Sequence, residues 1–212
     1  ILIVGAGPVG IATAAMLRRH GLRARIIDKS TGPTPYSKAV GMHARSLEAM
    51  HALGLTEQLI SDGHPLHQFR LTENGKTIMS AGFKDMGSAY EFVLGLPQSC
   101  TERRLLNRLQ AHGGDVEWEC ALLQLQETGD SSQDGARAQV LLQHADGTHE
   151  TVRCNWLIGA DGGRSAVREQ AGIPFTGGDY GNAFILGDAR IDWGGPKNEL
   201  QFFLSSQGYL LL

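Results

Sequence analysis

The pattern of hydrophobic and polar positions changes twice near the start of the chain. Ile1–Val4 is a short, continuous apolar run, which predicts a buried strand. Ile11–His20 carries helix-forming residues and ends at Gly21, a common helix terminator. Leu22–Asp28 returns to a strand pattern. We therefore expect a strand, a helix and a second strand joined as a parallel crossover unit.

The next stretch predicts two helices and then a hairpin. Helical periodicity runs from Ala44 to Leu53 and again from Thr56 to Asp62. Residues from His67 to Phe83 alternate around Asn74-Gly75, which is a strong hairpin signal. A hairpin interrupts the topology of a nucleotide-binding domain, so we expect it to serve something other than the nucleotide.

The second half predicts one long helix followed mainly by strands. Ser99-Cys100-Thr101-Glu102 has capping-box spacing and predicts a helix start, with Leu105, Leu106 and Leu109 on one face. The pattern from Val116 to Arg153 is typical of antiparallel strands joined by a polar loop and by the turn Asp146-Gly147. The later predictions are a buried strand, a short helix and then strands only, at Trp156–Gly159, about Ser165–Ala171 and after Gly177-Gly178.

Composition places the chain among globular proteins. It has 212 residues, 42% of them apolar, and 19 basic against 22 acidic residues give a formal net charge of −3. No basic block is present, so nothing in the sequence indicates binding to nucleic acid or to an anionic membrane. No run of about 20 apolar residues could cross a membrane.

The cysteines and the two ends of the chain add two expectations. Cys100, Cys120 and Cys154 are odd in number and form no Cys-x-x-Cys pair, which favours a reducing, cytoplasmic location over a disulfide framework. The sequence begins without methionine inside an apolar run and stops at Gly208–Leu212, a strand-like segment. We therefore expect a fragment of a longer polypeptide.

Three glycines between the first strand and the first helix form a dinucleotide fingerprint. Gly5, Gly7 and Gly10 have the spacing Gly-x-Gly-x-x-Gly, and each has a physical role. The first permits a tight turn, the second permits close approach of the backbone to phosphate, and the third permits close packing of helix on strand. The start of the helix then offers N–H groups and a partial positive charge to a pyrophosphate.

Asp28 closes the second strand, where a carboxylate can accept hydrogen bonds from ribose hydroxyls. An acidic residue there disfavours a 2′-phosphate, which argues against NADP at this position. The fingerprint and Asp28 together leave both FAD and NAD open.

Three later motifs distinguish between these cofactors. They are the run from Ser37 to Glu48 (Ser-Lys-Ala-Val-Gly-Met-His-Ala-Arg-Ser-Leu-Glu), then Leu96-Pro97-Gln98-Ser99, and then Leu157–Ser165 (Leu-Ile-Gly-Ala-Asp-Gly-Gly-Arg-Ser). In this order and spacing the chain resembles the aromatic-ring flavoprotein hydroxylases, which are single-component FAD monooxygenases of the p-hydroxybenzoate hydroxylase fold. The resemblance spans nearly the whole chain and favours FAD.

The resemblance implies roles for individual residues. Arg45 would contact the flavin or its pyrophosphate, and Gln98 would hydrogen-bond FAD. Asp161-Gly162 matches the second family motif, in which the aspartate contacts the ribityl–pyrophosphate region of FAD and the motif affects use of NAD(P)H. Arg164 and Arg168 are expected as structural partners of nearby carboxylates. The expected cofactor-binding residues are Gly5, Gly7, Pro8, Val9, Gly10, Asp28, Lys29, Arg45, Gln98, Asp161 and Gly162.

Some expected features are missing from the sequence. A third family motif, a Gly-Asp pair before a helix, is not matched by Gly187-Asp188, which falls in the predicted strand Ala183–Ile191; we expect the true motif beyond Leu212. The eight histidines show no metal-ligand spacing, and no side chain can be defended as a catalytic base. The chemistry is therefore expected to belong to the cofactor.

We expect an α/β fold with two domains. A Rossmann-like FAD-binding domain would be formed by residues 1–64 and 98–176. An inserted, sheet-based and incomplete substrate-binding domain would be formed by residues 65–97 and 177–212. Substrate would bind over the flavin ring, between the two domains.

The resemblance also implies a reaction. NADH or NADPH would reduce the bound FAD, dioxygen would be captured as a flavin C4a-hydroperoxide, and one oxygen atom would pass to an electron-rich, phenolic ring. The expected partners are this small aromatic substrate and O2, and a homodimer is kept open.

Two other interpretations remain. The same fold and FAD could serve Baeyer–Villiger oxidation or epoxidation; flavin-dependent halogenation is weaker because the Trp-x-Trp-x-Ile-Pro signature is absent. The chain could instead belong to a non-catalytic protein that holds FAD or an unstable intermediate.

Overall fold

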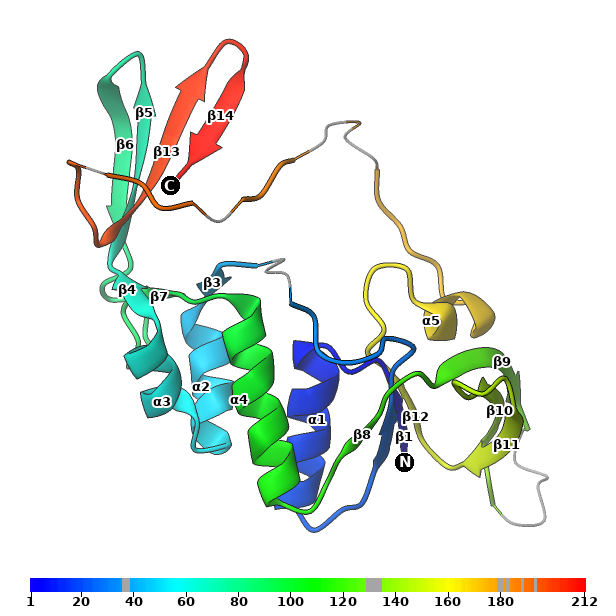
Figure 1. The fold of residues 1–212 in the computed structure, drawn as a ribbon. Coiled ribbons are helices and arrows are strands. Elements are labelled where there is room, and N and C mark those ends of the chain that lie inside the picture. The colour runs from blue at the N-terminus through cyan, green and yellow to red at the C-terminus, as the bar shows by residue number, and fades with distance from the viewer. Residues whose placement is uncertain (36–38, 129–134, 179–180, 182–183, 188, 193) are drawn as a thin grey trace. The chain divides into compact units, whose positions relative to one another are not determined.

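The chain folds into two units, each built from two separate segments. The computed structural model describes residues 1–35, 39–128, 135–178, 181, 184–187, 189–192 and 194–212 (Figure 1). The first unit comprises Ile1–Tyr36 and Thr101–Asn182, and the second comprises Ser37–Cys100 and Ala183–Leu212. Residues 37–64 thus group with the hairpin, whereas we expected them in the FAD-binding domain. The division into compact units does not show whether residues 37–64 belong to the FAD-binding domain, so the domain boundaries stay a prediction.

A four-stranded parallel sheet forms the centre of the first unit. Its order is β12 (Leu157–Gly159), β1 (Leu2–Val4), β2 (Arg25–Ile27) and β8 (Val116–Glu117). Helix α1 (Pro8–Arg19) connects β1 to β2, as predicted for a parallel crossover.

The direction of β8 corrects the sequence analysis. We expected antiparallel strands from Val116 onward, but Val116–Glu117 pairs in parallel with β2. The strand follows helix α4 (Gln98–Ala111), and a helical crossover returns the chain in the same direction as the neighbouring strand.

A three-stranded antiparallel sheet follows in the chain, as predicted. It consists of β11 (His149–Cys154), β10 (Ala138–Gln143) and β9 (Ala121–Glu127), in that order. The predicted turn at Asp146-Gly147 joins β10 to β11, with Gly147 at φ +80°. Most of the predicted polar loop, residues 129–134, lies outside the described residues.

The hydrophobic core of the first unit lies on both faces of the parallel sheet. Leu2, Val4 and Ile27 cluster with residues of the antiparallel sheet and its flanks, including Val140 and Leu142. The strand residues between them point to the opposite face, where α1 packs, because successive side chains in a strand alternate. Figure 1 shows the resulting order of layers, with α1 on one side of the parallel sheet and β9–β11 on the other. Each fully buried aliphatic side chain contributes roughly 1.5–3 kcal/mol.

Arg25 joins the two sheets of the first unit. Its guanidinium donates to Glu117 of β8 at 2.7 and 2.8 Å and to Glu150 of β11 at 2.7 and 2.8 Å. His144 Nε2 lies 3.0 Å from the same Glu150 carboxylate. The hydrogen bonds from Arg25 lower the pKa of Glu150 to about 2, so this carboxylate is ionised at neutral pH.

The second unit contains the two predicted helices and a small sheet. Helix α2 spans Ala44–Ala52 and α3 spans Thr56–Asp62, close to the predicted ranges. The three-stranded sheet has the order β3 (Gly41–Met42), β7 (Val93–Gly95) and β4 (His64–Leu66).

The predicted hairpin forms and takes part in a second sheet of this unit. Strands β5 (Gln68–Glu73) and β6 (Lys76–Gly82) are joined by Asn74 and Gly75, both with positive φ, as a two-residue hairpin turn requires. Strand β13 (Glu199–Ser205) pairs in parallel with β5, and β14 (Gly208–Leu211) completes the order β14-β13-β5-β6. The sheet therefore joins the two segments that we assigned to the substrate-binding domain.

Three further expectations were wrong. Helix α4 begins at Gln98 rather than being capped at Ser99, and its Glu102 accepts from the Thr34 backbone N–H, at 3.3 Å. Trp156 lies outside β12 and is 64% exposed, and β12 is an edge strand that pairs only with β1 among the described residues. The predicted strand Ala183–Ile191 has no strand at its described residues 184–187 and 189–191, where no neighbouring strand among the described residues offers a hydrogen-bonding ladder.

Candidate functional site

The fingerprint turn follows β1 and requires glycine at its first and third positions. Gly5 adopts φ +103°, and a Cβ there would lie 2.4 Å from the Ala160 carbonyl oxygen. A Cβ on Gly10 would lie 1.9 Å from the Gly5 carbonyl oxygen. Both positions are closed by backbone atoms, which cannot move aside as a flexible side chain could.

Gly7 differs from these two glycines because the space beside it is open. Apart from its neighbours in the chain, no atom of the described residues lies within 4 Å of the position that its Cβ would occupy. Gly7 is the N-cap of α1, it has no side chain to cap the helix, and Pro8 occupies the first turn. Val9, the next residue, is 69% exposed. A helix start without an acidic residue or a side-chain cap fits a pyrophosphate at this place.

Asp28 is connected directly to the glycine turn. Its Oδ2 accepts from the Ala6 backbone N–H at 2.6 Å, and its Oδ1 accepts from the Ser30 backbone N–H at 2.8 Å. A carboxylate offers about four lone-pair sites, so capacity remains for ribose hydroxyls. The neighbouring Lys29 is exposed. The contact of Asp28 with a ribose stays a prediction.

The second motif lies beside the glycine turn because β12 and β1 are parallel neighbours. The Ala160 N–H donates to the Val4 carbonyl oxygen at 2.7 Å, and the Gly5 Cβ position is 2.6 Å from the Asp161 nitrogen. The carboxyl ends of the two strands therefore bring Asp161-Gly162 and the fingerprint together. Gly162 has φ +83° and open space around its Cβ position.

The Asp161 carboxylate is engaged by the short helix α5 (Ala166–Gln170). Its Oδ1 accepts from Ser165 Oγ at 2.5 Å, and its Oδ2 accepts from the backbone N–H groups of Ala166 and Val167 at 2.7 and 3.3 Å. Ser165 is the N-cap of α5 and accepts from the Arg168 N–H at 3.0 Å. Sequence reasoning missed this role of Ser165, although the spacing Asp-x-x-x-Ser before a helix was its signal.

Arg168 fixes the other side of the same turn. Its Nη1 donates to the Gly163 carbonyl oxygen at 2.8 Å, and its Nη2 pairs with Glu169 at 3.2 Å. Its guanidinium carbon lies 4.6 Å from the centre of the Phe175 ring, within cation–π distance. The expectation that Arg168 partners a nearby carboxylate is confirmed by its pairing with Glu169.

Arg45 and Gln98 belong to the second unit. Arg45 lies in the first turn of α2, its side chain is 93% exposed, and its Nη1 pairs with Glu48 at 2.7 Å. Gln98 is half-buried and is the first residue of α4 rather than part of an extended segment. Their contacts with FAD stay predictions, as do those of the other expected cofactor-binding residues.

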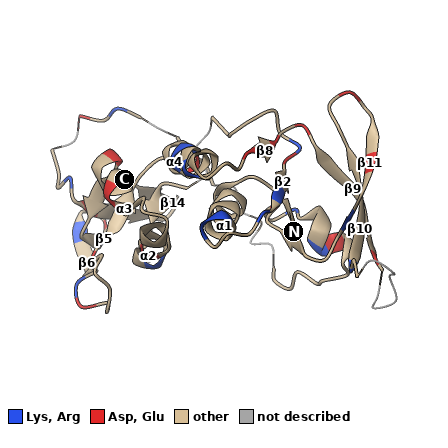
Figure 2. Ribbon diagram, turned by 90° about the horizontal axis from the view of Figure 1, so that it is seen from below, with Lys and Arg blue, Asp and Glu red and all other residues tan. Residues whose placement is uncertain are grey.

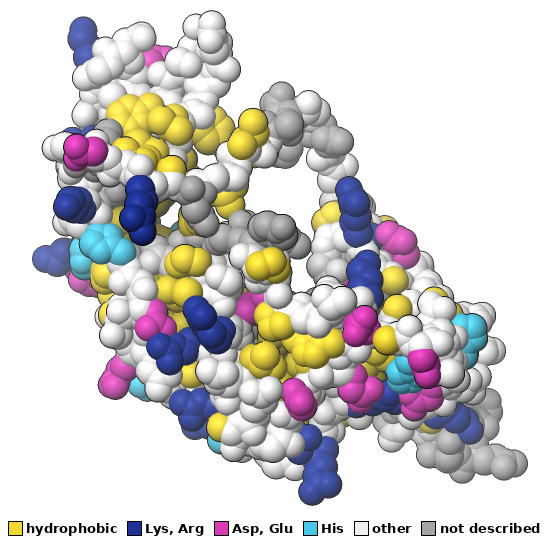
Figure 3. Space-filling view, in the orientation of Figure 1, with side chains coloured by type: hydrophobic (Ala, Val, Ile, Leu, Met, Phe, Trp, Pro, Cys, Tyr) yellow, Lys and Arg dark blue, Asp and Glu magenta, His cyan; other side chains and the backbone are white. Residues whose placement is uncertain are grey.

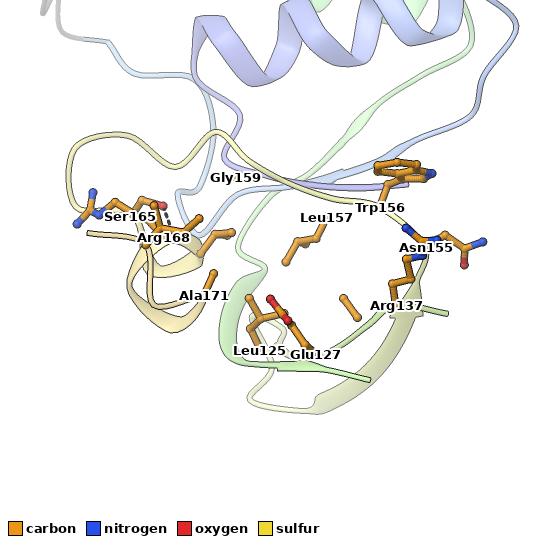
Figure 4. A pocket seen from close by; sticks show the side chains of 13 residues that line it. Leu125, Glu127, Arg137, Asn155, Trp156, Leu157, Gly159, Ser165, Arg168 and Ala171 are labelled. Carbon is orange, nitrogen blue, oxygen red and sulfur yellow. Dashed lines mark hydrogen bonds between the residues drawn. The ribbon is translucent and has the colours of Figure 1, made fainter. Parts of the chain in front are cut away.

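A cavity of about 540 Å³ lies elsewhere in the first unit. Figure 4 shows its lining side chains, which come from β9, β12, α5 and the segments beside them and include Leu125, Trp156 and Ala171. Its lining contains none of the fingerprint glycines and not Asp28. The cavity is therefore separate from the expected pyrophosphate site.

The described residues hold neither a metal-binding cluster nor a membrane-spanning helix. No group of three or more His, Cys, Asp or Glu side chains there is arranged to hold a metal ion. No helix in the same residues is both long and apolar enough to span a membrane. The ribbon in Figure 2 shows basic and acidic residues interspersed along the elements, in keeping with the net charge of −3.

The parallel sheet, the glycine turn and Asp28 together define a dinucleotide-binding α/β protein. The whole chain apart from its last residues, 1–207, matches the family described as FAD binding domain, and the chain belongs to that family. FAD is therefore the cofactor of this fold, as the later sequence motifs predicted.

Relatives support this assignment over the full chain. The chain is 35% identical to 6-methylpretetramide 4-monooxygenase of Streptomyces rimosus over 214 residues, covering 100% of the chain and 37% of the relative. It is 37% identical to pentachlorophenol 4-monooxygenase of Sphingobium chlorophenolicum over 216 residues, covering 100% of the chain and 39% of that protein. The chain thus spans less than half the length of these relatives.

Solved structures share the fold. The anhydrotetracycline hydroxylase OxyS from Streptomyces rimosus matches with a TM-score of 0.72 at 30% identity, over 84% of this chain and 34% of its own. The p-nitrophenol 4-monooxygenase PnpA from Pseudomonas putida DLL-E4 matches with the same TM-score at 23% identity, over 81% of this chain and 42% of its own, and informs on the fold alone. The expected α/β fold and the resemblance to flavoprotein aromatic hydroxylases are confirmed.

Proposed function

We propose that the protein containing this chain is an FAD-dependent monooxygenase that uses NAD(P)H and O2 to hydroxylate a small aromatic, phenolic molecule. The observation that carries the proposal is the glycine turn with the open Gly7 position, connected to Asp28 through the Ala6 N–H. The relatives add the reaction type, since those compared are named as monooxygenases, one of them of pentachlorophenol.

The chain's own residues would bind and orient the cofactor. Gly5, Gly7, Pro8, Val9 and Gly10 would hold the pyrophosphate at the start of α1, and Asp28 would accept from the ribose. The Asp161-Gly162 turn, Arg45, Gln98 and Lys29 would complete the contacts. When bound, FAD supplies the redox chemistry, accepting a hydride from the nicotinamide and activating dioxygen.

One face of the β14-β13-β5-β6 sheet carries aromatic side chains, which favours an aromatic molecule as the proposed substrate. Phe69 and Phe202 pack with ring centres 6.4 Å apart, and Phe202 and Tyr209 with centres 6.5 Å apart. Tyr209 is 55% exposed and Met79, on β6, is 48% exposed. Figure 3 shows hydrophobic side chains at the surface where Figure 1 places this sheet. Rings of this kind bind other rings by offset or edge-to-face packing.

The finer parts of the proposal rest on the family resemblance. The nicotinamide has no fingerprint of its own in this sequence and would act as a visiting co-substrate. The oxygen-transfer route, a cytoplasmic location and a homodimer belong to the same proposal.

Flavin binding and turnover test the proposal directly. The purified full-length protein should be yellow, and a phenolic substrate should stimulate NAD(P)H oxidation coupled to O2 uptake, with a product heavier by one oxygen atom. Gly7→Val should remove FAD without unfolding the protein, because among the described residues no atom beyond the chain neighbours lies within 4 Å of the new Cβ. Gly177→Ala, which also adds a side chain into open space, serves as the control. A colourless protein that binds only NAD would refute the proposal.

The alternatives give different products. Baeyer–Villiger activity would yield esters or lactones from ketones. Flavin binding without turnover across a broad phenol panel would favour a protein that only holds FAD or an intermediate.

A further inference from the structure

A chain of contacts in the second unit runs from Arg45 to the segment between β6 and β7. Glu48, one turn after Arg45 on α2, accepts from Arg45 Nη1 with its Oε2 at 2.7 Å. Its other oxygen, Oε1, accepts from Ser88 Oγ at 2.8 Å. Glu48 therefore uses one oxygen for the arginine and the other for the segment that follows the hairpin.

The segment that carries Ser88 is itself fixed on α2. Ser88 Oγ accepts from the Tyr90 N–H at 3.2 Å, and the Tyr90 hydroxyl lies 3.4 Å from His51 Nδ1, one turn beyond Glu48. Tyr90 packs edge-on against Phe92 with ring centres 6.2 Å apart. The two contacts with α2, Ser88–Glu48 and Tyr90–His51, and this ring contact hold the Ser88 hydroxyl in place.

Two features of Arg45, its exposure and its place at the start of a helix, disfavour an ordered and positively charged side chain. Its side chain is 93% exposed, and its place in the first turn of α2 puts a positive charge near the positive end of the helix dipole. A long, exposed guanidinium has many rotamers, and ordering them on binding a ligand is unfavourable. Hydrogen bonds from Ser88 and Arg45 lower the pKa of Glu48, so its carboxylate stays ionised at neutral pH.

We propose that Glu48, held by Ser88, is a positioning residue that orients Arg45 for the anionic pyrophosphate of FAD. The proposal rests on the function proposed above, in which Arg45 contacts FAD. Glu48 takes only Nη1 of the guanidinium, and the remaining N–H groups suit phosphate oxygens. The proposal thereby gives the segment that follows the hairpin an indirect part in cofactor binding, through Ser88 and Glu48.

The test is a double-mutant cycle on FAD affinity in the full-length protein, measured by titrating the apoprotein with FAD. Glu48→Gln keeps the size of the side chain and an acceptor for Ser88 but removes the charge. It should weaken FAD binding roughly two- to fivefold, the range expected when an exposed ion pair is lost. Arg45→Ala should weaken it roughly tenfold or more, as for a hydrogen bond to a charged group. In the Arg45→Ala background, Glu48→Gln should have almost no further effect.

Controls separate positioning from folding. Glu57→Gln makes the same change at an exposed glutamate on α3, outside this chain of contacts, and should leave FAD affinity unchanged. Ser88→Ala should weaken FAD binding in the same direction as Glu48→Gln but less. The thermal midpoint of each apoprotein should match that of the parent.

Several outcomes would overturn the inference. They are unchanged or tighter FAD binding by Glu48→Gln, an equal loss in the presence and absence of Arg45, and an Arg45→Ala protein that binds FAD as tightly as the parent. The last result would remove the arginine contact itself while leaving the flavoprotein proposal to be judged by colour, turnover and Gly7→Val.

Discussion

At the scale of single residues, the Asp161 carboxylate has protein partners of its own beside the FAD contact expected of it. Its two oxygens already accept from Ser165 and from two N–H groups at the start of α5. The turn that this capping defines lies against Gly5. We therefore expect Asp161 to influence FAD through the shape of the turn rather than chiefly through a direct contact.

Asp161→Asn and Ser165→Ala test this expectation as a pair. Each substitution removes part of the cap at the start of α5. A cap is worth about 1 kcal/mol in typical helices, so both substitutions should weaken FAD binding by similar factors. Flavin titration of the two apoproteins provides the measurement. A direct contact predicts a different result, in which Asp161→Asn loses at least about tenfold in affinity and Ser165→Ala keeps the parent value.

At the scale of elements, Arg25 connects strands that are far apart in the sequence. It lies on β2 and binds Glu117 of β8 and Glu150 of β11, so one side chain joins the parallel sheet to the antiparallel sheet. Both glutamates are at least 40% exposed, and water therefore screens part of the attraction. The two ion pairs therefore add only moderately to the stability of the fold, but they join β2 and β8 of the parallel sheet to β11 of the antiparallel sheet.

Arg25→Met should lower the free energy of unfolding at pH 7 by about 1 kcal/mol and flatten its pH dependence in acid. The folded pKa of Glu150, about 2, lies below its ordinary value of 4.5. Its contribution is complete above pH 4.5 and is lost as the pH falls from there through about 2. Urea unfolding of Arg25→Met and of the parent, at a series of pH values from 7 to 2, measures this free energy. An unchanged acid slope in Arg25→Met would show that the pair carries no stability.

Some elements could be predicted from the sequence because their signals are local. Asn74-Gly75 specifies its hairpin by turn chemistry, and the fingerprint glycines specify a strand, a turn and a helix start. The direction of Val116–Glu117 could not be predicted, since a two-residue strand carries no periodicity and pairs according to the preceding crossover. Glu102 resembled a capping residue, yet its carboxylate meets Thr34, 68 residues away in the chain. Partners of this kind follow from the tertiary fold.

At the scale of the whole molecule, the cofactor should contribute to stability. A ligand that binds only the folded state stabilises it by about 2.7 kcal/mol at a concentration one hundred times its Kd. Removing FAD should therefore lower the thermal midpoint, and adding FAD should restore it. Differential scanning fluorimetry of the parent and of Gly7→Val checks this. A midpoint of Gly7→Val that rises with FAD as steeply as the parent's would contradict the assigned site.

The parallel pairing of β5 with β13 has a consequence for the order of events during synthesis. Arg70 on β5 bonds Glu199 on β13, 129 residues later, and the first unit is likewise made of two distant segments. While the ribosome is still adding the intervening residues, β5 has only its hairpin partner. Neither unit can close until its second segment has been synthesised, and such long-range pairing slows folding. Until β13 is synthesised, β5 exposes the apolar side chains that later pack against it, such as Phe69 against Phe202, and surface of this kind is prone to aggregation.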